Sequence, residues 1–149
     1  MNMSAARTSN QCFMEVLKTA LIVSVPVFLL TVILYGNPWV NRLYQKSMKI
    51  GTIKTWKSQG KFLVMNYFFI LIETLLFAWV FSIITIHPAT DWIAGGVYFG
   101  VFLCLIRIIP RSLDTFAMVH YPLRLLIAEL INGCIISFLM GIGISYFIF

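Results

Sequence analysis

The sequence predicts an all-α, polytopic membrane protein with four transmembrane helices in one bundle. Of its 149 residues, 60% are hydrophobic and only 11% are charged, whereas a soluble domain carries roughly 25% charged residues. A water-soluble fold of this size would lack the polar surface to cover itself. The composition therefore excludes a soluble enzyme, a disordered chain and a nucleic-acid-binding domain, despite the net charge of +6.

Four long apolar runs mark the membrane spans, which we expect at residues 20–36, 62–86, 92–109 and 125–146. A helix that crosses a hydrocarbon core of roughly 30 Å needs about 17–25 apolar residues. The runs are continuously apolar rather than alternating, which favours helices over strands. The first span has room to begin earlier, near Phe13. At this length we expect residues 1–149 to form a single four-helix domain.

A basic segment, residues 37–61, connects the first two spans. Asn37 suits a helix N-cap and Pro38 the first helical position, so the segment predicts a short amphipathic helix in the membrane interface. Its cations Arg42, Lys46 and Lys49 are candidates for binding anionic lipid headgroups. The alternative is an ordinary basic loop that only sets topology.

The positive charges predict how the chain is oriented. Nine of the eleven Lys and Arg residues, counting Arg107, lie in or beside the first and third connections. Cytoplasmic loops of membrane proteins are enriched in Lys and Arg. We therefore expect both basic connections in the cytoplasm, both termini outside, and a multi-pass protein of the cell (inner) membrane.

Glu73 is the charged residue that is most out of place. It is the twelfth residue of the 25-residue run 62–86, near the expected bilayer midplane. A charge there costs roughly 2.5–3.5 kcal/mol on insertion scales and is functional by default. We expect proton or ion handling by Glu73, with Ser137 at similar depth and Asn66 seven residues earlier. The alternative is a neutral glutamate that only holds the helix packing.

Arg107 and Glu129 form a second candidate pair. They lie near the facing ends of the third and fourth spans, which a short loop joins. A salt bridge between these neighbouring helices would neutralise both charges and fix their register. Asn132, one turn beyond Glu129, extends this polar site inward. The alternatives are a structural pair, a gate or a substrate-binding site.

Small residues recur every four positions in the third and fourth spans. Gly96 and Gly100 lie in the third span, and Gly133 and Gly141 lie in the fourth. Such stripes allow close approach of helix backbones in a membrane. We expect them to mediate either contact between these two helices or a homodimer.

Motifs for enzyme chemistry are missing. Cys12, Cys104 and Cys134 are isolated, and the sequence has no Cys-x-x-Cys pair, catalytic triad, Walker loop or dinucleotide-binding fingerprint. We predict no catalytic residue, no metal and no cofactor, and we consider an enzyme, such as a lipid-modifying one, the weaker class.

Two stretches give the chain a loose resemblance to a family of small four-span bacterial membrane proteins of uncharacterised function. They are the sequence LYGNPW at 34–39 and IPRSL at 109–113, the latter following a glycine-containing helix. The resemblance covers about two thirds of the chain. It implies a bacterial inner-membrane origin and no particular activity.

Two functions remain open from the sequence. The first is a small, oligomeric, proton-linked transporter or channel-like protein, with Glu73 as its protonatable group and Arg107, Glu129 and Asn132 as an inner gate. The alternative is a non-transporting membrane scaffold or accessory subunit whose polar residues lock helix packing. The expected partners are the lipid bilayer and either a second copy of the chain or another membrane subunit, with no nucleic acid.

Overall fold

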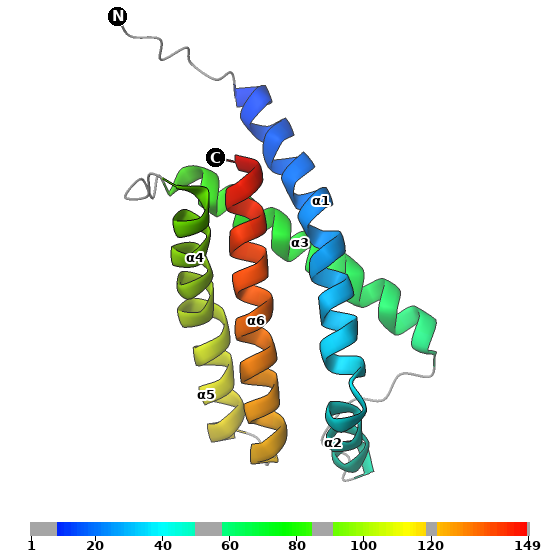
Figure 1. Cartoon of the computed structure of the whole chain (residues 1–149). Helices are drawn as coiled ribbons and strands as arrows, with labels where there is room; N and C mark the ends of the chain where they lie inside the picture. Colours follow the sequence, from blue (N-terminus) through cyan, green and yellow to red (C-terminus); the bar gives the residue numbers. More distant parts are fainter. Residues whose placement is uncertain (1–8, 50–57, 85–90, 119–121, 149) are drawn as a thin grey trace, which may run out of the picture.

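The protein is an all-α, four-helix membrane bundle, which confirms the predicted fold class (Figure 1). The computed structural model describes residues 9–49, 58–84, 91–118 and 122–148. Four helices in these ranges are long and apolar enough to span a membrane, namely Phe13–Gly36, Gln59–Ile83, Trp92–Ala117 and Leu123–Ile148.

The helices follow the chain in a simple order. The first span belongs to α1 (Ser9–Gly36), the basic helix α2 (Pro38–Lys49) follows directly, and α3 (Gln59–Ile83) forms the second span. The third span combines α4 (Trp92–Leu103), a π-helical turn η1 (Cys104–Ile108) and α5 (Ile109–Met118). The fourth span is α6 (Leu123–Ile148).

The helix of the third span is longer than the sequence suggested. We expected it to end at residue 109, before Pro110, but it continues to Met118. Pro110 has no N–H to donate to the carbonyl four residues earlier, and its ring needs space there. The preceding turn is widened, so that the N–H of Ile109 donates to the carbonyl of Cys104, five residues back. The helix thus passes the proline without ending.

The start of α2 agrees with the expected capping. The Asn37 side-chain oxygen accepts a hydrogen bond from the N–H of Trp39 at 3.0 Å, and the helix begins at Pro38. Val40 is buried against the bundle, whereas Trp39 and Arg42 are exposed. This helix therefore lies with one apolar residue inward and its basic face outward.

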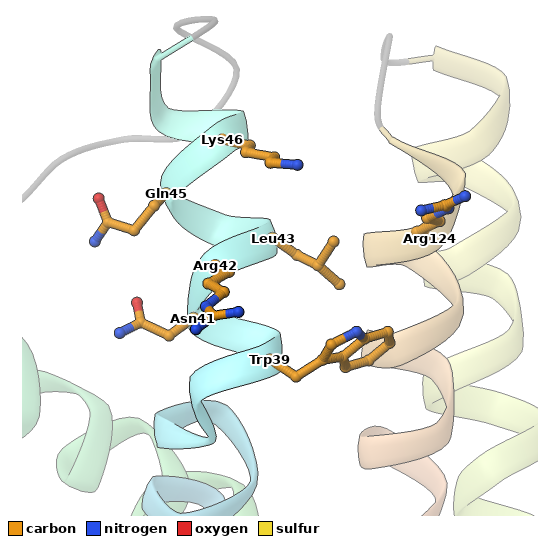
Figure 2. Close-up of a pocket in the computed structure, with 7 residues that line it drawn as sticks. All are labelled: Trp39, Asn41, Arg42, Leu43, Gln45, Lys46 and Arg124. Atoms are coloured by element: carbon orange, nitrogen blue, oxygen red, sulfur yellow. The ribbon is translucent and has the colours of Figure 1, made fainter.

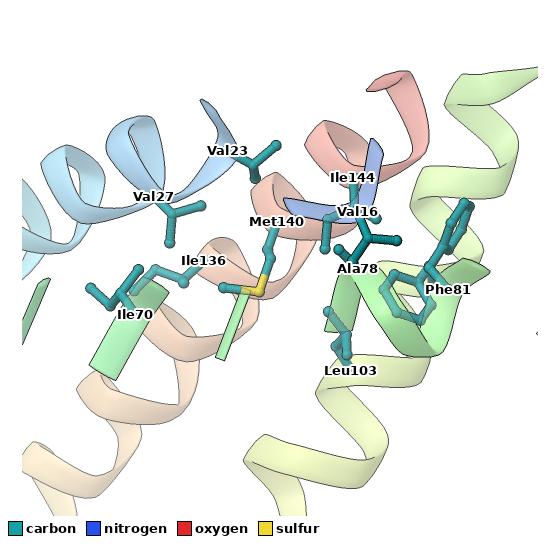
Figure 3. Close-up of a cluster of buried hydrophobic side chains, with 11 residues drawn as sticks. Val16, Val23, Val27, Ile70, Ala78, Phe81, Leu103, Ile136, Met140 and Ile144 are labelled. Carbon is teal, nitrogen blue, oxygen red and sulfur yellow. The ribbon is translucent and has the colours of Figure 1, made fainter. Parts of the chain in front are cut away.

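The core lies between α1, α3, α4 and α6 (Figure 3). Half of the apolar window of α6 is buried, against only 17% of that of α3. Thus α6 is the central helix, and α3 lies at the periphery with many apolar side chains exposed, as in a lipid-facing helix. The buried cluster includes Val23, Val27, Ile70, Ala78, Phe81, Phe99, Leu103, Ile136, Met140 and Ile144.

The basic helix α2 lies at one end of the bundle. Figure 1 shows it at the same end as the last turn of α5 and the beginning of α6, whereas the beginning of α1 and the end of α6 lie at the opposite end. The described termini are therefore on the same side, as an even number of spans requires. We call the end that holds α2 the basic end.

Helices α4 and α6 pack with their backbones almost in contact. A Cβ on Gly96 would lie 2.6 Å from Cα of Ile142, and a Cβ on Gly141 would lie 2.6 Å from the backbone nitrogen of Gly100. A Cβ on Gly100 or Gly133 would meet a side-chain atom of the facing helix at 2.8 Å. All four glycines lie in this contact within one chain, which we call the glycine seam.

A single methyl group in the glycine seam should destabilise the bundle. Gly141→Ala places its Cβ 2.6 Å from the Gly96 oxygen and the Gly100 nitrogen, and both are backbone atoms that cannot move aside cheaply. We expect a loss of about 1–3 kcal/mol in the free energy of unfolding, measured by denaturant titration in detergent micelles. The matched control is Gly36→Ala, where nothing lies within 4 Å of the new Cβ. Equal stability of the two variants would contradict this packing.

Candidate functional site

An ion pair inside the bundle joins α3 to the third span. Nη2 of Arg107, in η1, lies 2.6 Å from Oε2 of Glu73, and the two side chains are 24% and 28% exposed, respectively. Both residues lie well inside apolar helices. A charge-assisted hydrogen bond of this kind offsets part of the cost of placing each charge in a membrane. The pair therefore holds the two helices together at this level.

The partner expected for Arg107 was wrong. We expected Arg107 to pair with Glu129, but the structure gives both residues other partners: Arg107 donates to Glu73, and Glu129 accepts a hydrogen bond from the Tyr44 hydroxyl. The neighbouring Ile108 packs against Gly133 of α6. Adjacent residues on a helix point in different directions, so Ile108 meets α6 while the Arg107 side chain meets Glu73 of α3.

The guanidinium of Arg107 also lies near an aromatic ring. Its Cζ is 6.0 Å from the ring centroid of Phe77, one turn after Glu73 on α3. This distance is at the limit of a favourable cation–π contact. The Glu73 carboxylate and the Phe77 ring lie on the same face of α3, and both contact Arg107.

Two buried N–H donors lack a described partner at this level of the bundle. Within the described part of the chain, Nη1 of Arg107 and Nδ2 of Asn132 are buried and have no hydrogen-bond partner. Asn132 is only 8% exposed. It precedes Gly133, which packs against Ile108, the neighbour of Arg107, so both donors lie at the same level of the bundle. Buried polar groups are nearly always paired, so both are available to an acceptor.

A second polar contact lies nearer the basic end. The Tyr44 hydroxyl of α2 donates to Oε1 of Glu129 on α6, and the Tyr44 ring lies 6.1 Å from the ring of Tyr35 on α1. We call the ion pair and the Tyr44–Glu129 contact together the polar site.

Tyr44 is a member of the polar site that the sequence analysis missed. The usable signal was its spacing, because Tyr44 follows the buried Val40 by four residues and so shares its face of α2. The basic residues of the segment drew attention to the opposite, exposed face. A tyrosine on the inward face of an amphipathic helix is well placed to meet a half-buried carboxylate.

The two residues expected beside Glu73 have different surroundings. The Ser137 hydroxyl is buried and donates to the carbonyl of Gly133 at 2.9 Å, within α6 and along the glycine seam. Asn66 is half-buried on α3, two turns before Glu73. The Glu73 carboxylate instead accepts a hydrogen bond from Arg107, which we did not expect beside it.

The candidate lipid-binding cations lie on α2. Arg42 and Lys46 are exposed, and Lys49 is the last residue of the helix, with its side chain outside the described part of the structure. For metals, the described residues contain no group of three or more His, Cys, Asp or Glu side chains that could hold an ion.

Comparisons of the chain with protein-family models, with curated proteins and with solved structures gave no match. The resemblance to a small bacterial membrane family through residues 34–39 and 109–113 therefore stays a prediction. What the geometry defines directly is an integral membrane protein with a charged pair in its interior.

Reversing the ion pair should test the contact between Glu73 and Arg107. Each single variant, Glu73→Arg or Arg107→Glu, brings two like charges together inside the span, and we expect each to lose about 2–3 kcal/mol of unfolding free energy. The double variant restores opposite charges and should regain most of that loss in detergent unfolding experiments. The control combines Arg107→Glu with Glu129→Arg, which should give no rescue. Rescue by the control instead would overturn the assignment of partners.

Proposed function

We propose that this protein is a small proton-linked transporter or channel-like protein in which Glu73 takes up and releases the proton. The observation that carries the proposal is the ion pair between Glu73 and Arg107 inside an apolar span, at 2.6 Å. Ionisable groups in membrane helices mark ion or proton pathways by default. Both side chains keep about a quarter of their surface accessible, so the pair is not sealed inside the protein.

The ion pair supplies a two-state element. While Glu73 is ionised, it attracts the Arg107 guanidinium and ties α3 to η1. Protonation of Glu73 removes its negative charge and most of that attraction, which releases Arg107. The freed guanidinium, together with the unpaired amide of Asn132, then presents N–H donors to an anionic or hydrogen-bond-accepting cargo. Proton uptake and cargo binding are linked in this way through one side chain.

The contact between Tyr44 and Glu129 serves as the inner gate in this proposal. It connects α2 to α6 on the basic-end side of the ion pair. Separation of these two groups would let water reach Arg107 and Asn132 from that end. The gate therefore keeps Glu129 from the expected set and adds Tyr44, whereas Arg107 and Asn132, which we also expected in the gate, lie behind it.

The proposal places the basic end in the cytoplasm and both termini outside, in the inner membrane of a bacterial cell. Nine of the eleven cations, counting Arg107, belong to the connections at this end, which supports the orientation. Only 17% of the apolar window of α3 is buried within the chain. We therefore include a second copy or a partner membrane subunit, packed on α3, in the functional unit.

A non-transporting scaffold is the second candidate. The glycine seam favours it, because such close packing of α4 on α6 gives a rigid platform. In that case the ion pair only fixes the position of α3. The two candidates differ in one measurable property, since only a transporter requires that Glu73 exchange its proton.

Proton flux separates the two candidates. The protein is reconstituted into phosphatidylethanolamine–phosphatidylglycerol vesicles that contain a pH-sensitive dye, and an imposed pH gradient is followed with time. We expect the gradient to dissipate faster than in empty vesicles. The difference between the two rates, the excess rate, should fall at least about tenfold for Glu73→Gln, because a side-chain amide is not a proton acceptor near neutral pH. Glu73→Asp keeps a titratable group and should retain part of the rate.

The control for flux is Asp114→Asn, which removes an exposed carboxylate from α5. It should dissipate the gradient at the wild-type rate. Wild-type rates in Glu73→Gln vesicles, or no excess rate for the wild type, would contradict the transporter proposal and favour the scaffold. Thermal unfolding of each variant in detergent checks that lost flux does not reflect lost folding.

A further inference from the structure

A groove separates α2 from the beginning of α6 at the basic end. Figure 2 shows Trp39, Leu43 and Lys46 extending from α2 toward the helix that carries Arg124. Arg42 completes the cationic lining, and the groove has a volume of about 430 Å³. This volume is within the range of small-ligand sites, roughly 300–1,000 Å³.

The charged side chains that line the groove are positive. Among the described residues, its lining contains Arg42, Lys46 and Arg124 and no acidic side chain. Three cations that share one groove repel one another, and an anion between them would relieve that repulsion. Arginine binds phosphate oxygens through two parallel N–H donors, and lysine binds them as a point charge. The chemistry of the lining thus matches a phosphate group.

The groove is held open by contacts that do not involve its cations. Buried Val40 and the hydrogen bond from Tyr44 to Glu129 attach α2 to the bundle. Because α2 is fixed in this way, the positions of Arg42 and Lys46 relative to Arg124 are set before any ligand arrives. Preorganised donors bind more tightly than donors that must be ordered on binding.

The position of the groove identifies the source of the phosphate. It lies where α1 leads into α2 and where α6 begins, at the ends of two membrane spans. This is the depth of the lipid headgroups. Trp39 is 58% exposed beside it, and tryptophan favours this interface because its ring is apolar while its N–H is polar. Leu43 adds an apolar wall next to the cations.

We infer that this groove is a binding site for the headgroup of an anionic phospholipid, which bridges α2 and α6. Arg42, Lys46 and Arg124 contact the phosphate, and Trp39 and Leu43 contact the glycerol and the first acyl carbons. Arg124 distinguishes this site from a general basic surface, because it brings a cation from a different helix to the same groove. The site does not depend on the proposed transport activity.

Lipid binding by the whole protein tests the inference. Detergent-solubilised protein is titrated with phosphatidylglycerol or phosphatidylcholine, and bound lipid is counted by native mass spectrometry. We expect phosphatidylglycerol to bind more tightly, and Arg124→Gln to weaken it about fivefold, the effect of one interfacial cation. The double variant Arg42→Gln with Arg124→Gln should lose about 25-fold.

The matched control is Lys61→Gln, which removes an exposed cation from the beginning of α3, outside the groove. It should leave phosphatidylglycerol affinity unchanged. Equal weakening by Lys61→Gln and Arg124→Gln would mean that binding follows overall charge, and would overturn the site. Equal affinity for phosphatidylcholine, or displacement of the lipid by millimolar inorganic phosphate, would overturn it as well. Circular dichroism of each variant confirms that the helices are intact.

Discussion

One interaction governs the interior of this protein: a carboxylate and a guanidinium inside apolar helices stabilise each other while both are charged. Alone, each charge would cost roughly 2.5–3.5 kcal/mol in a membrane. Paired at 2.6 Å, Glu73 and Arg107 neutralise each other's charge and fix α3 against η1. This link matters most for α3, because little of its apolar surface is buried within the chain.

The bundle therefore combines two kinds of helix contact. The glycine seam joins α4 to α6 through backbone proximity, which tolerates no added atom. The polar site adds two contacts between side chains. The ion pair joins α3 to η1, and the hydrogen bond from Tyr44 to Glu129 joins α2 to α6. The glycine seam is rigid, whereas the contact between α3 and η1 depends on the charges of Glu73 and Arg107. A change in the charge of Glu73 would therefore act first on Arg107.

The fold was largely predictable from the sequence, because long apolar runs have few alternatives in a bilayer. The glycine spacing also predicted a close contact, either between these two helices or between two copies, and the structure has it between the third and fourth spans. The partner of Arg107 was not predictable, because helices that are apolar on every side do not reveal which face meets a neighbour. Pro110 added a second difficulty, since proline usually ends a helix, and here a π-helical turn carries the chain past it. Consequently Arg107 lies deeper than its distance from the expected end implied.

The most direct test of this account is solid-state NMR of the protein in lipid bilayers, with ¹⁵N-labelled arginine and ¹³C-labelled glutamate. The account predicts an ionised Glu73 carboxylate with strong dipolar coupling to a guanidinium nitrogen of Arg107, as the 2.6 Å contact requires. Arg107→Lys should abolish the arginine coupling at that carboxyl carbon. A protonated Glu73 without coupling, or coupling of Arg107 to Glu129 instead, would contradict it.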